Sequence, residues 1–378
     1  MDKTINVLQI GMTRNIGGVE SYLMQQYNHI DRKKIRYDFV NITGEYKIVF
    51  NDKILSNGDN IYNICSRHLN PIKHYYQWLK LLINNRKKYQ VIVLNANSLV
   101  YIFPLFIGKI FKIPIRIIHS HNTENENKVN FIKRIVINVN KVLLRFSVTD
   151  YFACSKKAGE WMFGTNVPFK IVHNAIEIDK FKYNQKERIA IRKILNLEGN
   201  FVLGHVGRFS YQKNHDFLIA IFKEIVEIIP NSILLLIGEA VGDDYYYIRA
   251  QEKVKKLDLE KNVKFLGLRE DVFKIMQGLD CFILPSHFEG LPLVGIEAQT
   301  AGLPCYFSNN ITQEAKVTNL VEFISLEKSP KYWANRIIEC KGVKRIDTSE
   351  DIAQAGYDIN KEIKKIENLY LRNINGEI

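Results

Sequence analysis

Two glutamates, Glu289 and Glu297, stand eight positions apart, directly after an apolar stretch. Pro292 lies between them, and proline is favoured at the first position of a helix. A helix that begins there leaves Glu289 in the preceding loop and places Glu297 about one and a half turns inside. Carboxylates at such a helix start can accept hydrogen bonds from the hydroxyl groups of a ligand. Two solvated glutamates beside an ordinary helix would show the same spacing, so the pattern needs support from other residues.

The backbone between the two glutamates offers donors to a different ligand group. The N–H groups around Gly290, Leu291 and Leu293 occupy the expected helix N-terminus, where unpaired donors and the helix dipole favour a phosphate. One carboxylate can then bind hydroxyls of a group attached to that phosphate, and the other can reach hydroxyls of a nucleoside. The segment therefore indicates a nucleotide-type site.

Cations for a diphosphate follow another apolar run, at 201–207. Gly207 and Arg208 end this run, and Lys213 comes five residues after Arg208. Arginine supplies a planar fork of donors and lysine a point charge, and both suit a diphosphate. No Asp-x-Asp triplet is present to hold a divalent ion, so we expect no metal and no other cofactor. Taken singly, either cation could be an ordinary surface charge.

The first half of the chain contributes a glycine pair and a histidine pair. Gly17 and Gly18 follow the first apolar run and allow close approach of a ligand to the backbone, although the dinucleotide fingerprint G-x-G-x-x-G is absent. His119 and His121 end another apolar run, and strand alternation places them on the same side. No third metal ligand has recognisable spacing, so contact with substrate is the functional interpretation. Two polar loop histidines are the alternative.

These residues need strands and helices that bring them to one edge. Apolar runs alternate with helical patterns twice along the chain, which predicts two Rossmann-like β/α arrays facing each other across a cleft. The segment 173–187 is the candidate hinge, and Asn214 can cap the helix that follows Lys213. The expected strands include 5–10, 37–42, 91–94, 115–119, 201–207, 232–238, 263–266 and 280–285, and the expected helices include 19–29, 130–146, 214–229, 245–257 and 292–301.

Composition excludes several classes of protein. Hydrophobic residues make up 46% and charged residues 25% of the 378, as in soluble globular proteins, so disordered, collagen-like and disulfide-scaffold chains are excluded. The five cysteines contain no C-x-x-C pair, which argues against a zinc site or redox pair. The most apolar stretch, 99–111, is too short to span a bilayer, and the N-terminus lacks the pattern of a signal peptide. We therefore expect a cytoplasmic protein.

The positive charge lies entirely in the first half. Residues 1–178 hold 25 Lys and Arg against 12 Asp and Glu, whereas residues 179–378 hold 28 of each. The helical stretch 130–146 has one apolar face and a basic stripe with Arg134, Lys141 and Arg145. Such asymmetry predicts an anionic partner, and an acidic membrane surface fits better than nucleic acid because no nucleic-acid motif is recognisable. Basic residues that only keep the domain soluble are the alternative.

Together the motifs resemble those of the group 1 (family 4) glycosyltransferases of GT-B fold, in particular the bacterial capsular and exopolysaccharide assembly enzymes. The resemblance spans about 5–340, with one departure at Ala175, where many members have glycine. Its motifs are G-G-V-E at 17–20, H-S-H-N at 119–122, V-H-N-A-I at 172–176, G-R-x4-K-N at 207–214, L-I-G-E at 236–239, V-K-F-L-G at 263–267 and E-x7-E at 289–297.

The resemblance implies a retaining transfer of a sugar from a nucleoside diphosphate sugar to a hydroxyl. Glu289 would hold the transferred sugar and Glu297 the ribose, with Glu239 also on the donor side. Arg208 and Lys213 would bind the diphosphate, and the Gly17–Gly18 loop the phosphates or acceptor. The cleft histidine of the family matches His121, which we favour, or His119. The family also implies that the last helix returns to the first domain, giving domains 1–178, completed by about 357–378, and 179–356.

We therefore expect a metal-independent retaining glycosyltransferase at the inner face of the cell membrane. Its donor would be a nucleotide sugar, most simply a UDP-sugar, and its acceptor a lipid-pyrophosphate-linked saccharide. A nucleotide-sugar epimerase of the same architecture is one alternative, and a non-catalytic sugar-binding partner of another transferase is a second. The E-x7-E segment with its upstream cations favours transfer.

Overall fold

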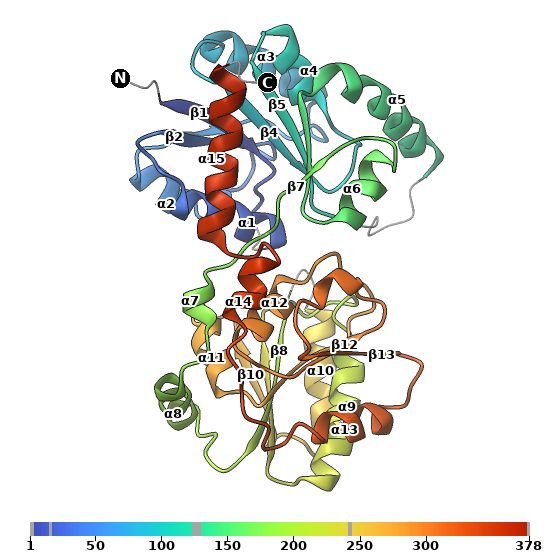
Figure 1. Cartoon of the computed structure of the whole chain (residues 1–378). Coiled ribbons are helices and arrows are strands. Elements are labelled where there is room, and N and C mark those ends of the chain that lie inside the picture. The colour runs from blue at the N-terminus through green and yellow to red at the C-terminus, as the bar shows by residue number, and fades with distance from the viewer. Residues whose placement is uncertain (1–3, 15–16, 123–129, 241–243, 376–378) are drawn as a thin grey trace. The chain divides into compact units, whose positions relative to one another are not determined.

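The computed structural model of this chain describes residues 4–14, 17–122, 130–240 and 244–375. The chain divides into two compact units, Met1–Ala175 with Ile359–Ile378, and Ile176–Asp358. Each unit is a parallel sheet covered by helices (Figure 1). The expectation of two Rossmann-like α/β domains is confirmed.

The first unit is built on a seven-stranded parallel sheet of order β3-β2-β1-β4-β5-β6-β7. Successive residues of β4 alternate between its faces: Val91 and Val93 join one buried cluster, and Ile92 and Leu94 join the other. The strands are β1 Ile5–Ile10, β2 Ile35–Asn41, β3 Ile61–Asn63, β4 Val91–Ala96, β5 Ile115–Ser120, β6 Asp150–Ala153 and β7 Lys170–Ile171.

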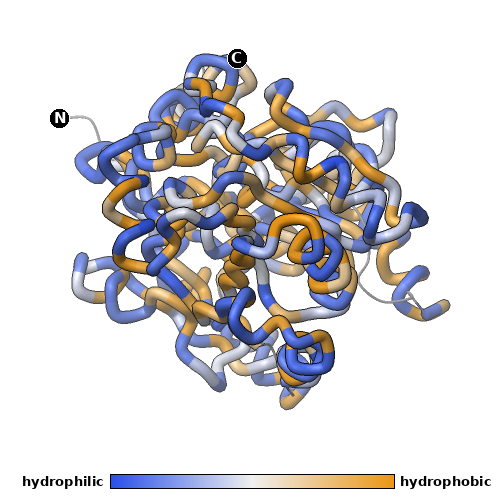
Figure 2. The backbone as a smooth tube through the Cα atoms, turned by 90° about the horizontal axis from the view of Figure 1, so that it is seen from below, coloured by the Kyte–Doolittle hydropathy of each residue, from blue (hydrophilic) through white to orange (hydrophobic). Residues whose placement is uncertain are grey.

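Helices cover both faces of this sheet (Figure 1). In the tube view of the whole chain, hydrophobic and hydrophilic residues alternate over short stretches (Figure 2). They are α1 Gly18–His29, α2 Asn51–Ser56, α3 Pro71–Asn85, α4 Phe103–Ile110, α5 Phe131–Ser147, α6 Lys156–Phe163 and α15 Ile359–Asn375.

Helix α15 completes the core of the first unit, although it follows the whole second unit in sequence. It lies against α1 and β5 (Figure 1). Ile363, Ile366 and Tyr370 are buried in the same cluster as the β1 residues Ile5 and Val7. Its acidic residues also bind the first unit's backbone, because Glu362 accepts the His173 N–H at 3.2 Å and Glu367 accepts the Asp31 N–H at 2.7 Å.

Three elements between β2 and β4 were not predicted: α2, β3 and α3. Helix α3 has clear start signals, since the Asn70 side chain accepts the Lys73 N–H at 2.9 Å and Pro71 is its first residue. It buries Trp78 and Leu82 against the sheet. Strand β3 has only three residues, none of them fully buried, so its pattern is too short to stand out.

The second unit has a six-stranded parallel sheet of order β10-β9-β8-β11-β12-β13. The strands are β8 Phe201–Val206, β9 Ser232–Ile237, β10 Val263–Gly267, β11 Cys281–Leu284, β12 Cys305–Ser308 and β13 Val321–Ile324. The helices are α7 Ile178–Phe181, α8 Gln185–Ile194, α9 His215–Ile228, α10 Tyr245–Lys256, α11 Val272–Gly278, α12 Leu293–Thr300, the short 3-10 turn Gln313–Ala315, α13 Pro330–Ile338 and α14 Ser349–Gln354. Across both units, none of the described helices combines the length and apolarity needed to cross a membrane.

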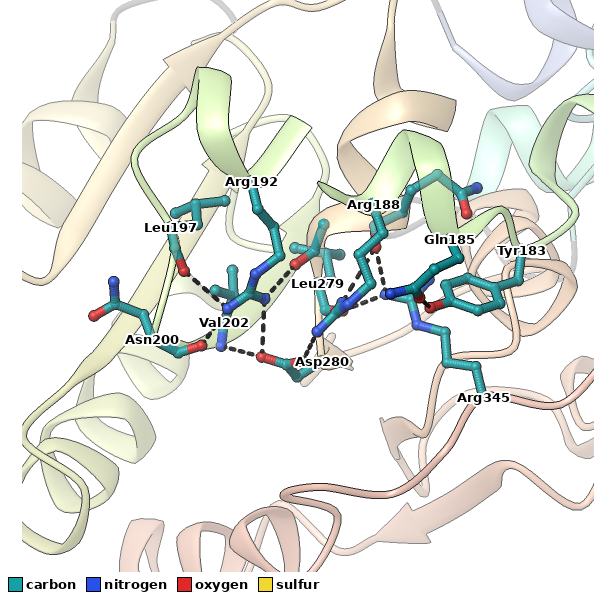
Figure 3. Close-up of polar contacts among 12 residues, drawn as sticks. Tyr183, Gln185, Arg188, Arg192, Leu197, Asn200, Val202, Leu279, Asp280 and Arg345 are labelled. Carbon is teal, nitrogen blue, oxygen red and sulfur yellow. Dashed lines mark hydrogen bonds and ion pairs between the residues drawn. The ribbon is translucent and has the colours of Figure 1, made fainter. Parts of the chain in front are cut away.

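Arginines and one aspartate brace the amino-terminal end of this sheet (Figure 3). Asp280, just before β11, accepts the Val202 N–H at 2.7 Å and lies 2.5 Å from Arg188 Nη2 and 3.3 Å from Arg192 Nη1. Arg345 donates to the carbonyls of Met276 and Gln277, at the end of α11, at 3.1 and 2.9 Å. Helix-end carbonyls that lack intrahelical partners are thereby satisfied, and β8 and β11 are tied together at their starts.

Candidate functional site

Glu289 and Lys213 form an ion pair at the carboxyl end of the second sheet. Lys213 Nζ lies 2.7 Å from Glu289 Oε1, and only 14% and 9% of the two side chains are exposed. Lys213 follows β8 and Glu289 follows β11, which are neighbours in the sheet. Sequence analysis assigned the two residues to different ligand groups. The structure brings them into direct contact.

Two further side chains hold the Glu289 carboxylate. Ser286 Oγ donates to Oε1 at 2.8 Å, and Gln212 Nε2 donates to Oε2 at 3.1 Å. Each carboxylate oxygen therefore has a donor besides the charge of Lys213, which lowers the cost of burying the ion pair. Sequence reasoning missed both residues. Ser286 opens the same motif as Glu289, but nothing in the sequence singles out Gln212.

Two glycines permit the close packing at the end of β8, where Lys213 lies. A Cβ on Gly207 would lie 2.8 Å from Lys213 Cε, so any side chain there would displace the lysine. Gly238, at the end of β9, has a φ of +145°, and a Cβ on it would lie 2.1 Å from the Gly207 carbonyl oxygen. Gly207 thus acts by admitting the lysine stem.

Asn214 does not cap α9 with its side chain, contrary to our prediction. It has a left-handed φ of 54°, and its Nδ2 donates to the Pro285 carbonyl at 3.1 Å. Asparagine tolerates this conformation better than most residues. Its side chain ties the loop after β8 to the end of β11, so it supports the position of Lys213.

Arg208 and Glu239 lie at the same edge but outside the ion-pair cluster. Both are exposed, and neither side chain makes a hydrogen bond or ion pair with another described residue. The backbone places them side by side, because the Phe209 N–H donates to the Glu239 carbonyl at 3.0 Å. Arg208 therefore keeps all five guanidinium donors available to a ligand.

Helix α12 begins at Leu293, with Pro292 in the capping position and no side-chain cap. Gly290 and Leu291 lie in the loop between Glu289 and that start. The uncapped first turn leaves backbone N–H groups for a ligand, in the place where the sequence predicts phosphate binding.

Glu297 lies within α12, whereas Glu289 lies in the loop before that helix. Its side chain is half-buried and makes no hydrogen bond within the described residues. Burial raises the pKa of Glu297 to about 7, with Lys180 opposing the shift. A carboxyl group that is close to half-ionised at neutral pH can act as donor or acceptor towards a hydroxyl.

Two buried histidines, not predicted, lie beneath Lys213. Burial lowers the pKa of His205 to about 3 and holds that of His215 well below its usual range, and the Lys213 charge adds to both shifts. Phe209 stacks on His215 with ring centroids 4.1 Å apart. Both rings therefore stay neutral and leave Lys213 as the positive charge at this point.

His119 and His121 lie together at the carboxyl end of β5 in the first unit. Their ring centroids are 4.0 Å apart, and His121 Nε2 lies 3.0 Å from Asn95 Oδ1. Burial lowers the pKa of His121 to about 3, and burial with the nearby His121 holds the pKa of His119 well below its usual range. His119 is fully buried and His121 partly exposed, so His121 is the one with a surface for a ligand. Both act as neutral imidazoles.

Gly17 and Gly18 lie at the start of α1, which begins at Gly18, one residue before the predicted helix 19–29. Gly17 is the capping residue, and its carbonyl accepts the Ser21 N–H at 3.0 Å. Glu20, in the first turn, is buried and accepts both the N–H and the hydroxyl of Thr13, at 2.9 and 2.7 Å. A Cβ on Gly17 would lie 2.9 Å from Glu20 Oε2. The glycine therefore permits this turn.

No metal site is built from protein groups within the described ranges. There, no three side chains of His, Cys, Asp or Glu gather so that they could hold an ion.

Residues 187–358 match the family model of the group 1 glycosyl transferases. Over 376 residues the chain is 29% identical to the putative glycosyltransferase EpsF of Bacillus subtilis, covering 96% of both chains. Over 216 residues it is 31% identical to the UDP-Gal:alpha-D-GlcNAc-diphosphoundecaprenol alpha-1,3-galactosyltransferase of Escherichia coli, covering 54% of each. Among solved structures, Anabaena HepE in complex with UDP superposes with a TM-score of 0.73 at 16% identity, over 99% of this chain and 100% of that one. The fold is GT-B.

The raised pKa of Glu297 predicts a pH dependence of stability. Between about pH 4.5 and 7 the folded state binds a proton that the unfolded state has lost, so the free energy of unfolding falls as pH rises through this window. The loss is on the order of 3 kcal/mol. Glu297→Gln should remove that slope, as measured by urea unfolding at several pH values. The exposed control Glu327→Gln should keep it, and equal slopes in all three proteins would contradict the burial of Glu297.

Proposed function

We propose that this chain, a group 1 glycosyltransferase by its residues 187–358, transfers a sugar with retention from a nucleoside diphosphate sugar to a lipid-linked saccharide. The observation that carries the proposal is the Glu289 carboxylate, held by Lys213, Ser286 and Gln212 directly before an uncapped helix start. UDP as the nucleotide is supported by the HepE complex, and a lipid diphosphate acceptor by the name of the Escherichia coli relative. Polysaccharide assembly is the corresponding cellular role.

In the proposed complex, each group of the donor contacts particular residues. Glu289 accepts hydroxyls of the transferred sugar, and Lys213, at 2.7 Å from it, stands between that sugar and the diphosphate. Arg208 and the first turn of α12 bind the diphosphate, and Glu297 binds the ribose. Glu239 is on the donor side, next to Arg208 along the sheet edge. His121, with His119 behind it, contacts the sugar as a neutral hydrogen-bonding group.

In the proposed mechanism, the main task of the protein is to stabilise the negative charge that develops on the leaving diphosphate. As the bond from the sugar's anomeric carbon to the phosphate oxygen breaks, Arg208, Lys213 and backbone N–H groups stabilise the growing negative charge. The acceptor hydroxyl attacks from the face that the leaving group vacates, and its proton passes to the departing phosphate oxygen. The configuration is thereby retained without a protein nucleophile. Because cations and helix donors balance the diphosphate charge, the proposed reaction is independent of metal and cofactor.

The proposed acceptor brings the enzyme to a membrane. A lipid-linked saccharide is held in a bilayer, and α5 of the first unit carries exposed Arg134, Lys141 and Arg145. Cations near an anionic leaflet each contribute about 1 kcal/mol of attraction. We therefore place the enzyme at the cytoplasmic face of the cell membrane, as a peripheral protein.

Glu289→Gln should nearly abolish transfer without weakening UDP binding. The amide loses the charge-assisted contact at the reacting sugar, on the order of 2–4 kcal/mol of transition-state stabilisation. It also releases Lys213 towards the diphosphate. Initial rates and UDP titrations measure the two effects, with Glu327→Gln as the control for loss of one carboxylate. A rate within threefold of wild type would contradict the role of Glu289.

Arg208→Ala should weaken binding of the nucleoside diphosphate and leave binding of the free nucleoside unchanged. Its guanidinium makes no hydrogen bond or ion pair with another described residue, so the effect measures ligand contact. A chelator should leave the wild-type rate unchanged. Activity that disappears with chelator and returns with magnesium or manganese would show that a metal, and not these residues, balances the charge. Assays with each nucleotide sugar alone would expose an epimerase, which converts the sugar without acceptor.

Replacement of Arg134, Lys141 and Arg145 by Glu should release the protein from anionic vesicles. Three cations at about 1 kcal/mol each correspond to roughly a hundredfold in binding at moderate salt. Co-sedimentation with liposomes at low and high salt measures the effect. If the variant and the wild type sediment equally with the vesicles, the three basic residues have no role in membrane binding and are only a solvated surface.

A further inference from the structure

Helix α5 has three faces, and only one of them is covered. Leu144 and Ser147 are buried against the unit, and Ile137 is partly buried. Most of its other apolar residues are exposed. The apolar face of this amphipathic helix therefore points to solvent and not to the core. The exposed residues, here called the apolar stripe, are Phe131, Ile132, Ile135, Val136, Val139, Val142, Leu143 and Phe146.

The apolar stripe includes large side chains that are mostly exposed to solvent. Phe131 is 77% exposed and Phe146 64%, at opposite ends of the helix. On the neighbouring α4, Phe106 and Ile110 are exposed as well, and Lys109 Nζ lies 5.8 Å from the centre of the Phe146 ring. A contiguous apolar surface bordered by cations is typical of a segment that meets lipid.

A cavity of about 360 Å³ opens beside this helix, and its wall combines cations with apolar side chains. Arg134 and Lys141 are two turns apart and lie on the same side of α5. Neither makes an ion pair with a carboxylate in the described parts of the chain. Six of the lining residues are Arg134, Lys141, Ile137, Leu99, Trp161 and Met162.

We propose that this cavity binds the diphosphate of the lipid-linked acceptor, with the lipid chain lying along the apolar stripe. The inference rests on the proposed function, since it locates that acceptor on the first unit. Arg134 and Lys141, which pair with no carboxylate among the described residues, supply two cations for the phosphates. Ile135 and Val142 directly follow these cations in sequence and belong to the apolar stripe, so the stripe begins next to the cavity. A headgroup and its chain thus meet a charged pocket and an apolar surface in continuous order.

Other occupants match only part of this arrangement. A free nucleotide would use the cations but leave the apolar stripe uncovered. A second copy of the chain would cover the apolar stripe but bring its own positive charge, because the first half of each chain carries 25 basic against 12 acidic residues. An amphiphile with an anionic head satisfies both surfaces.

Farnesyl diphosphate, a short prenyl diphosphate, is the probe that tests the cavity. The full chain is first saturated with UDP, so that the probe cannot occupy the donor site, and is then titrated by calorimetry. We expect Arg134→Gln/Lys141→Gln to weaken binding at least tenfold. The control Lys109→Gln/Lys133→Gln removes two exposed cations of the same region that do not line the cavity, and its affinity should stay within twofold of wild type.

Trp161 reports where the probe binds. It is the partly exposed tryptophan in the cavity wall, whereas Trp78 and Trp333 are fully buried. The probe should change the tryptophan fluorescence of wild type, and Trp161→Phe should lose that change. Val139→Ser/Val142→Ser should weaken farnesyl diphosphate binding severalfold and leave inorganic pyrophosphate binding unchanged. Both positions are exposed, and in the proposed complex they contact only the prenyl chain of the probe.

Two failures are distinguishable. The cavity assignment would be overturned if the wild type binds UDP but not farnesyl diphosphate. It would also be overturned if Arg134→Gln/Lys141→Gln binds farnesyl diphosphate as tightly as the control Lys109→Gln/Lys133→Gln does. The proposed function would stand in either case. Wild type that fails to bind UDP would overturn the proposed function at the first step. If Val139→Ser/Val142→Ser weakens the binding of farnesyl diphosphate and of inorganic pyrophosphate to the same extent, the assignment of the prenyl chain to the apolar stripe is overturned.

Discussion

The ion pair of Lys213 with Glu289 is the contact on which the polar edge of the second unit depends. Burying two charges is unfavourable unless each finds its partner and further hydrogen bonds. Ser286 and Gln212 provide these bonds, while Gly207 leaves space for the lysine stem and Gly238 leaves space for the Gly207 backbone. Loss of one charged partner would leave the other buried and uncompensated. The carboxylate is therefore positioned before any ligand arrives, as preorganised binding requires.

The opposite end of the same sheet explains how that geometry is kept. Asp280 joins the start of β11 to the start of β8 through the Val202 N–H, and Arg188 and Arg192 of α8 pair with it (Figure 3). Arg345, before α14, donates to the Gln277 carbonyl beside them. Burial and the nearby Arg188 lower the pKa of Arg345 to about 9, yet the group remains a cation at neutral pH. With both ends of the two central strands fixed, the loops after them cannot slide against one another.

The sequence predicted local features well and long-range pairing poorly. Strand alternation, the start of α12 and the position of Glu297 within that helix follow from spacing over a few residues. The contact of Lys213 with Glu289 joins positions 76 apart, and no local pattern shows that their strands are neighbours. Asn214 has the residue type of a cap, but a left-handed backbone sends its side chain to Pro285. Periodicity likewise revealed the apolar face of α5 without showing that nothing in the described chain covers it.

The return of α15 to the first unit has a consequence for biosynthesis. Ribosomes release a chain from its amino end, and domains usually fold as they emerge. Here the second unit, Ile176–Asp358, is continuous and can close its core while synthesis continues. The first unit must wait, because Ile363, Ile366 and Tyr370 fill a cluster that begins with Ile5. The segment up to Ala175 is therefore made before the second unit but completes its core after it, and the apolar surface that α15 covers stays open in the interval.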